Sequence, residues 1–110
     1  MLIDQSGNIT IITHERASIP EIVLRITKSY KKFKNNNIIV NLSSLGWIKL
    51  EEIIEFLQIS NTHRASKQSF VIVSNKIDYD YVPDELVVVP SLQEAYDIIE
   101  MEEIERDLGF

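Results

Sequence analysis

The side chains that could do acid, base or metal chemistry are few in this sequence, and their spacing is poor for it. The two histidines, His14 and His63, lie 49 positions apart, and neither has a second histidine at ligand spacing. A general base at His63 would need a nucleophile and an orienting acid, and no recognisable set is present. We therefore expect His14 to be a surface residue and His63 to lie at the negative end of a helix.

Three aspartates, Asp78, Asp80 and Asp84, begin like a calcium-binding loop. The position that needs glycine is Pro83, and the position that needs glutamate is Val89. The chain has no cysteine, so thiol catalysis and thiolate metal sites are excluded as well. We expect a solvated acidic loop here, and we expect the protein to have no metal, no cofactor and no enzymatic activity.

Charge is divided unevenly along the chain. Residues 1–76 carry ten Lys or Arg against six acids, and residues 77–110 carry one Arg against eleven acids. The acidic block would repel nucleic acid. The four clustered lysines look like a phosphate patch, but lysines in the last turn of a helix also complement its negative end, which is the reading we favour. These lysines are Lys28, Lys31, Lys32 and Lys34.

Targeting signals are not evident in the sequence. No apolar run approaches the roughly 18 residues of a membrane span, and the N-terminus lacks the basic and apolar regions of a signal peptide. We therefore expect a cytoplasmic protein that binds neither nucleic acid nor a membrane.

Apolar periodicity and turn residues predict a single α/β domain over residues 1–110, with residues 100–110 as an acidic C-terminal helix or tail. The order of elements is ββαβαββα, with the third helix reduced to a turn within 74–85, and a mixed sheet with helices packed on it is the simplest closure. The predicted strands are 1–5, 9–13, a strand that begins at 38, 70–73 and 86–89. The first predicted helix begins at a capping box of Ser18 with Glu21 and is broken by the asparagine triplet 35–37. The second runs from 50 to its end near 65–68, and the last begins at a capping box of Ser91 with Glu94, runs through 99 and extends at most to 107.

Two apolar patterns indicate how these elements pack. Residues 70–73 and 86–89 lack the alternation of a one-sided sheet, so both are expected to be central parallel strands covered on both faces. The second helix carries an apolar stripe with glutamates largely on the other side, and this stripe is expected to face the core. The stripe consists of Leu50, Ile53, Ile54 and Leu57.

Residues 38–73 resemble a STAS domain, the family of anti-sigma-factor antagonists and of the cytoplasmic domains of sulfate transporters. The pattern matches without a gap: an apolar strand, small polar residues, an apolar pair at Trp47 and Ile48, a helix and an apolar strand. Residues 89–95, VPSLQEA, are similar to the opening of the last helix of that family. The resemblance implies a STAS-like fold and a regulatory role through binding of a partner protein.

In antagonists of this family, a partner kinase phosphorylates a serine in a D-S-S-G segment at the start of the second helix. The corresponding residues 49–52 are KLEE, which places Glu51 at the acceptor position. A carboxylate has one negative charge and lacks the third oxygen of a phosphate, so the usual switch is expected to be absent. Ser43 and Ser44 could accept phosphate under a shifted alignment, or they could simply bond to backbone groups of the loop.

The resemblance implies a partner-binding surface on the loop and helix start from Ser43 to Glu55. Trp47 could anchor an interface there, but its aligned position is an apolar one under the sheet edge, so we expect Trp47 in the core. Leu108 either folds back with Ile104 onto the domain or, with Phe110, docks on a basic groove of a partner or of a second copy. The predicted partner-binding residues are Ser43, Ser44, Trp47, Lys49, Glu51, Glu52, Glu55, Leu108 and Phe110.

We therefore predict a non-enzymatic STAS-like interaction module without the serine switch, with a protein partner of unknown identity and possible homodimerisation. The alternative is a module that binds a nucleotide or an anionic metabolite near the same helix N-terminus. Residues 102–110 are also similar to the ending of short bacterial proteins labelled ribonuclease Z. That two-zinc hydrolase needs an H-x-H-x-D-H motif, which this sequence lacks.

Overall fold

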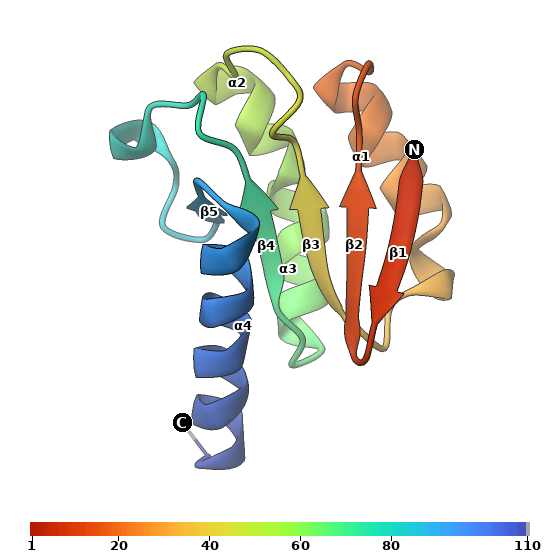
Figure 1. Cartoon of the computed structure of the whole chain (residues 1–110), viewed down its shortest axis with the longest axis vertical. Coiled ribbons are helices and arrows are strands. Elements are labelled where there is room, and N and C mark those ends of the chain that lie inside the picture. Colours follow the sequence, from red (N-terminus) through yellow and green to blue (C-terminus); the bar gives the residue numbers. More distant parts are fainter. Residues whose placement is uncertain (110) are drawn as a thin grey trace.

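Five strands form one mixed sheet in the order β1-β2-β3-β4-β5 in the computed structural model, which describes residues 1–109 (Figure 1). β1 and β2 form an antiparallel hairpin, and every later pair of neighbours is parallel. The expected mixed sheet and the order ββαβαββα are confirmed. The strands are β1 (Leu2–Ser6), β2 (Ile9–Thr13), β3 (Asn37–Asn41), β4 (Phe70–Val73) and β5 (Val87–Val89).

Helices cover the two faces of the sheet unequally. Figure 1 shows α1 and α3 behind the sheet and α4 in front of β4 and β5. The segment between β4 and β5 was predicted to hold a single turn in place of a full helix, and it holds the 3-10 turn η3. The α-helices are α1 (Ile19–Lys28), α2 (Leu50–Ile53), α3 (Leu57–Ala65) and α4 (Leu92–Asp107), and the 3-10 turns are η1 (Tyr30–Lys32), η2 (Ile54–Phe56) and η3 (Tyr79–Tyr81).

Local sequence accounts for where the two longest helices begin. Ser18 Oγ accepts a hydrogen bond from the Glu21 backbone N–H (3.4 Å), and Ser91 Oγ accepts one from Glu94 N–H (3.2 Å). Both bonds satisfy backbone donors that a helix N-terminus leaves without partners. In the hairpin before them, Gly7 takes a φ of +59°, which a residue without Cβ adopts at little cost.

Apolar side chains form one core on each face of the sheet. Strand alternation directs Ile38 and Val40 toward α1 and α3, and it directs Ile39 toward α4. The larger core includes Ile12, Ile22, Ile26, Phe33, Phe56 and Phe70, and the smaller one consists of Ile39, Val71, Val73, Ala95 and Ile99. Since α4 contacts β3, β4 and β5, the smaller core lies under that helix alone.

Three details of the expected fold are wrong. β5 is an edge strand with half-buried valines, because no strand follows it in the sheet. The first helix ends at Lys28 and continues only as a 3-10 turn. In the second helical segment Leu50 and Ile54 are exposed, because η2 interrupts the α-helix and the buried face passes through Ile53 and Phe56.

His14 is buried, which corrects the expectation of a surface residue. Its backbone N–H donates to the Asn41 carbonyl (3.3 Å), which continues the pairing of β2 with β3 by one residue. The alternation of the strand then places the His14 side chain on the same face as Ile12, toward α1. Burial lowers the pKa of His14, and nearby positive charge, including Arg25, lowers it further.

No helix among residues 1–109 combines the length and apolar character needed to cross a bilayer.

Candidate functional site

The loops that follow the parallel strands meet at one edge of the sheet, which we call the apical edge. It lies at the top of Figure 1, where residues 42–49 connect β3 to α2 and residues 74–78 lead toward η3. Ile48 forms an isolated parallel bridge with Ile77, and its backbone N–H donates to the Lys76 carbonyl (2.8 Å). Two loops far apart in sequence are therefore held side by side.

Large apolar side chains are exposed on these joined loops. Trp47 is 66% exposed and Tyr81 is 67% exposed, and Leu50 and Ile54 are exposed one helical turn apart. Trp47, Leu50 and Tyr81 surround a shallow hollow of ≈ 70 Å³, whose lining includes the buried Ile53. We call Trp47, Leu50, Ile54 and Tyr81 the apical patch.

The expectation that Trp47 lies in the core is wrong. Ile48 and Ile77 are paired by the bridge, and both side chains are buried in the core. Because adjacent residues of an extended segment face opposite sides, Trp47 points outward. Trp47 is therefore exposed, as the alternative role of an interface anchor requires.

Two of the polar residues predicted to bind a partner at this surface, Ser43 and Glu52, form side-chain hydrogen bonds within the loop and the helix start. Asn41 Oδ1 accepts hydrogen bonds from Ser43 N–H (3.1 Å) and from Ser43 Oγ (2.7 Å). Glu52 Oε1 accepts one from the Lys49 backbone N–H (3.0 Å), so this carboxylate helps to begin α2. Ser43 and Glu52 thus have local structural roles, although Ser43 is exposed. Ser44, Lys49, Glu51 and Glu55 are exposed as well.

Leu108 lies far from these residues. Figure 1 places the C-terminal end of α4 below the sheet and α2 above it. Leu108 is 66% exposed and Ile104 is 52% exposed, so neither is folded back onto the domain. The structure therefore does not join Leu108 to the surface from Ser43 to Glu55, and Phe110 lies outside the described residues.

His63 is buried at the opposite, basal edge, where the parallel strands begin. Its Nε2 lies 2.7 Å from the Asn36 carbonyl oxygen, and its Nδ1 lies 2.7 Å from Tyr30 Oη. Because a carbonyl can only accept, Nε2 carries the hydrogen and Nδ1 accepts from the tyrosine hydroxyl. Burial lowers the pKa of His63, the bond to Asn36 opposes this shift, and Arg64 adds to it. Both ring nitrogens are thus engaged in holding the fold.

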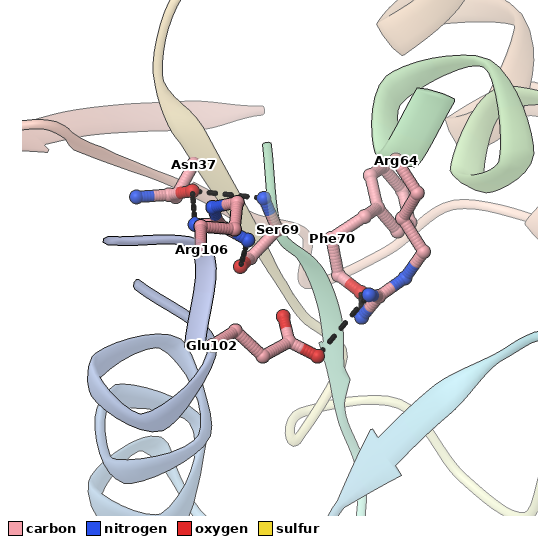
Figure 2. Close-up of polar contacts among 6 residues, drawn as sticks. All are labelled: Asn37, Arg64, Ser69, Phe70, Glu102 and Arg106. Carbon is pink, nitrogen blue, oxygen red and sulfur yellow. Dashed lines mark hydrogen bonds and ion pairs between the residues drawn. The ribbon is translucent and has the colours of Figure 1, made fainter. Parts of the chain in front are cut away.

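A second set of basal polar contacts connects α4 to the start of β3 and β4 (Figure 2). The buried Asn37 Oδ1 accepts from the Ser69 backbone N–H (2.8 Å) and from Arg106 Nη2 (3.3 Å), and Arg106 Nη1 donates to Ser69 Oγ (3.1 Å). Arg64 donates to Glu102 Oε2 (3.1 Å) and to the Phe70 carbonyl (3.1 Å). We call Asn37, Ser69 and Arg106 the basal junction.

Sequence reasoning missed the basal junction. Turn propensity indicates only that the asparagine triplet of residues 35–37 breaks a helix, and it assigns no partner to Asn37. The one available signal is a polar residue directly before a fully apolar strand. Such a residue is buried with the strand, and its amide must then find partners.

No metal site is apparent within residues 1–109, where no three His, Asp or Glu side chains lie close enough together to hold an ion. The three aspartates of the expected acidic loop, Asp78, Asp80 and Asp84, are exposed, and Asp78 Oδ1 also accepts from the Asp80 backbone N–H (3.1 Å), which shapes a turn.

No known family profile matches the chain, and no curated protein matches it in sequence. The fold is similar to that of a chain in the solved structure "Molecular architecture of the stressosome, a signal integration and transduction hub". The two chains share a TM-score of 0.61 and 12% sequence identity, over 90% of this chain and 96% of the other. The similarity gives no support to the ribonuclease Z resemblance of residues 102–110. At this identity the likeness shows the fold alone, and it confirms the expected STAS-like fold.

Proposed function

We propose that this chain is a non-enzymatic regulatory module that binds a partner protein through the apical patch, in the cytoplasm. The observation that carries the proposal is the exposure of Trp47 and Tyr81 on two loops joined by a bridge. Aromatic side chains dominate interface hot spots, because they bury a large area at a small cost in conformational entropy. The stressosome, to which the similar structure belongs, is described as a signal integration and transduction hub, which supports a regulatory role.

Glu51 adds a fixed negative charge beside the apical patch. It is exposed in the first turn of α2, at the position where the family resemblance places a phosphorylated serine. A carboxylate there cannot be switched by a kinase, so we propose that partner binding by this surface is constitutive. Ser44 is exposed on the same loop and stays a candidate for modification, whereas Ser43 Oγ already donates to Asn41.

The size of the apical hollow favours a protein over a small ligand. Its ≈ 70 Å³ compares with about 300 to 1,000 Å³ for pockets that enclose small molecules. A flat apolar surface beside a few charges is instead typical of the centre and rim of a protein interface.

The test is to capture binding proteins from a lysate of the native cells with the full chain as bait, in parallel with a Trp47→Ala, Glu51→Lys variant. The affinity of each purified candidate for both forms is then measured. We expect a partner that the parent chain retains and the double variant loses. Leu2→Ala is the matched control, since Leu2 is an exposed apolar residue of β1 that lies outside the apical patch.

A partner bound equally by the parent and the double variant would contradict the proposed surface, provided that circular dichroism shows both folded. Nucleotides or anionic metabolites that raise the melting temperature of the parent but not of the double variant would replace the proposal with the small-ligand alternative.

A further inference from the structure

A hollow of ≈ 340 Å³ opens around Thr13 and His14, where β2 ends. Its other walls are residues 1–2 at the start of β1, residues 15–17 and Arg25 of α1. Figure 1 shows the start of β1 and the end of β2 together at the apical edge. We call this space the His14 hollow. It shares no lining residue with the apical hollow, and its volume falls within the range of about 300 to 1,000 Å³ for pockets that enclose small molecules.

The His14 hollow contains a buried histidine with an unused nitrogen. His14 is only 1% exposed, and within residues 1–109 its buried Nε2 has no hydrogen-bond partner. The contrast is with His63, which is equally buried but has both ring nitrogens bonded within the fold. Burying a polar atom without a partner is unfavourable, so His14 is a polar residue from which the fold itself gains little.

Two arginines line the same hollow. Arg16 is exposed and forms no ion pair with any other described residue, whereas Arg25 is joined to Glu21 (2.7 Å). Glu15 is the single acid of the lining. Arg16 therefore supplies a cation that is available to a bound molecule.

Positive charge predominates around the His14 ring. Burial lowers its pKa, the amino group of Met1 and Arg25 lower it further, and the opposing effect of Glu21 is smaller. The ring is therefore neutral at neutral pH, with one nitrogen as a donor and the other as an acceptor. When Nε2 carries the hydrogen, it can donate to an oxygen atom, and the positive surroundings favour an oxygen with negative charge.

We infer that the His14 hollow binds a small organic anion. Its carboxylate or phosphate group accepts a hydrogen bond from His14 Nε2 and pairs with Arg16. A short apolar part of the same molecule packs against the apolar residues of the lining, which are Met1, Leu2 and Ala17. Since β1 is exposed along its whole length, the wall at Leu2 can shift at little cost to admit the ligand to Nε2.

NMR spectroscopy of the histidine rings in the full chain tests the inference, because the chain has only two histidines. Titration with butyrate or with ethyl phosphate, at constant pH and ionic strength, should shift the His14 signals until they saturate. The His63 signals should not move, since both nitrogens of that ring are bonded within the fold. Butyramide, which has the shape of butyrate without its charge, should shift neither ring. The anion that saturates at the lower concentration identifies the head group as a carboxylate or a phosphate.

Charge reversal at the rim of the hollow provides the second test. Arg16→Glu should weaken the binding of the better anion by about tenfold, because it replaces the unpaired cation by an acid. Lys32→Glu is the matched control. It reverses the charge of an exposed residue outside the hollow and should leave the affinity within about twofold of the parent. The Trp47→Ala, Glu51→Lys variant should bind the anion like the parent, so failure here is distinguishable from failure of the proposed function.

His14→Leu separates a binding role from a structural one. It keeps the backbone bond of residue 14 to Asn41 and removes a ring nitrogen that has no partner, so urea unfolding at neutral pH should show that stability is retained. An anion that raises the melting temperature of the parent should not raise that of this variant. The inference would be overturned by a His14 ring that neither anion shifts to saturation, by equal shifts of both histidines, or by equal affinity of the parent and Arg16→Glu.

Discussion

The two edges of the sheet differ in what their side chains do. At the basal edge, Asn37, His63 and Arg106 are buried or half-buried, and their polar atoms bond to other parts of the chain. At the apical edge, Trp47 and Tyr81 are exposed and contribute little to the core. We therefore expect stability to be concentrated at the basal edge, which leaves the apical edge free to bind other molecules.

The largest expected effect is on the basal junction. Asn37→Ala removes the oxygen that accepts from Ser69 and Arg106, and it leaves a buried backbone N–H without a partner. An unsatisfied buried group costs about 1 to 3 kcal/mol, and the loss of the charged partner adds to this. We expect the free energy of unfolding to fall by about 2 to 4 kcal/mol, measured by urea denaturation. A loss no greater than that of an exposed substitution such as Leu2→Ala would show that the basal junction does not stabilise the fold.

The next effect is a loss of stability in acid. Both histidines have a lowered pKa in the folded chain, from an ordinary value of 6.5. As the pH falls below about 6.5, the unfolded chain takes up protons before the folded chain does, so stability is present above that pH and decreases below it. Urea denaturation at several pH values measures the slope between neutral pH and the lowered pKa values.

His63→Phe should reduce the dependence of stability on pH, because it removes one of the two histidines whose protonation is linked to folding. The variant also loses the hydrogen bonds to Tyr30 and Asn36, so the slope with pH is compared and not the stability at one pH. NMR titration of the His63 ring gives the same information without mutation. A ring that titrates at or above its ordinary pKa would refute the prediction.

A smaller effect on the free energy of unfolding is expected at the apical edge, where substitutions of the neighbouring Glu51 and Glu52 should differ. Glu52→Ala removes the acceptor of the Lys49 backbone N–H and should cost about 0.5 to 1.5 kcal/mol. Glu51→Ala, the matched control one residue earlier, removes an exposed carboxylate and should stay within about 0.5 kcal/mol of the parent. Equal losses in thermal or urea unfolding would mean that the Glu52 bond does not hold the start of α2.

The smallest effect is expected at the apical patch. Trp47→Ala should change the free energy of unfolding by less than about 0.5 kcal/mol, because the side chain is mostly exposed. Trp47 is the single tryptophan, so its fluorescence reports on this site alone. We expect emission typical of a hydrated indole and ready quenching by iodide. Blue-shifted emission of the parent that resists quenching, together with a large loss of stability in Trp47→Ala, would show that Trp47 is buried.

Local patterns were sufficient for the elements of the fold and much less so for the candidate site. Ser18 and Ser91 cap the two longest helices, and such a bond is predictable from sequence because it joins residues only three positions apart. The prediction for Trp47 failed, because the direction of its side chain depends on the bridge between Ile48 and Ile77, 29 positions apart. The untested partner-binding residues near Trp47 stay predictions.

The sequence by itself determined the order of elements and the mixed sheet, because periodicity, capping and turn residues act over a few positions. Only the tertiary structure decided that β5 lies at the edge, that His14 and His63 are buried, and that Asn37, Ser69 and Arg106 meet. These outcomes depend on contacts between segments distant in the chain. A buried polar group takes whichever partners the packed elements bring to it, and no local pattern names those partners in advance.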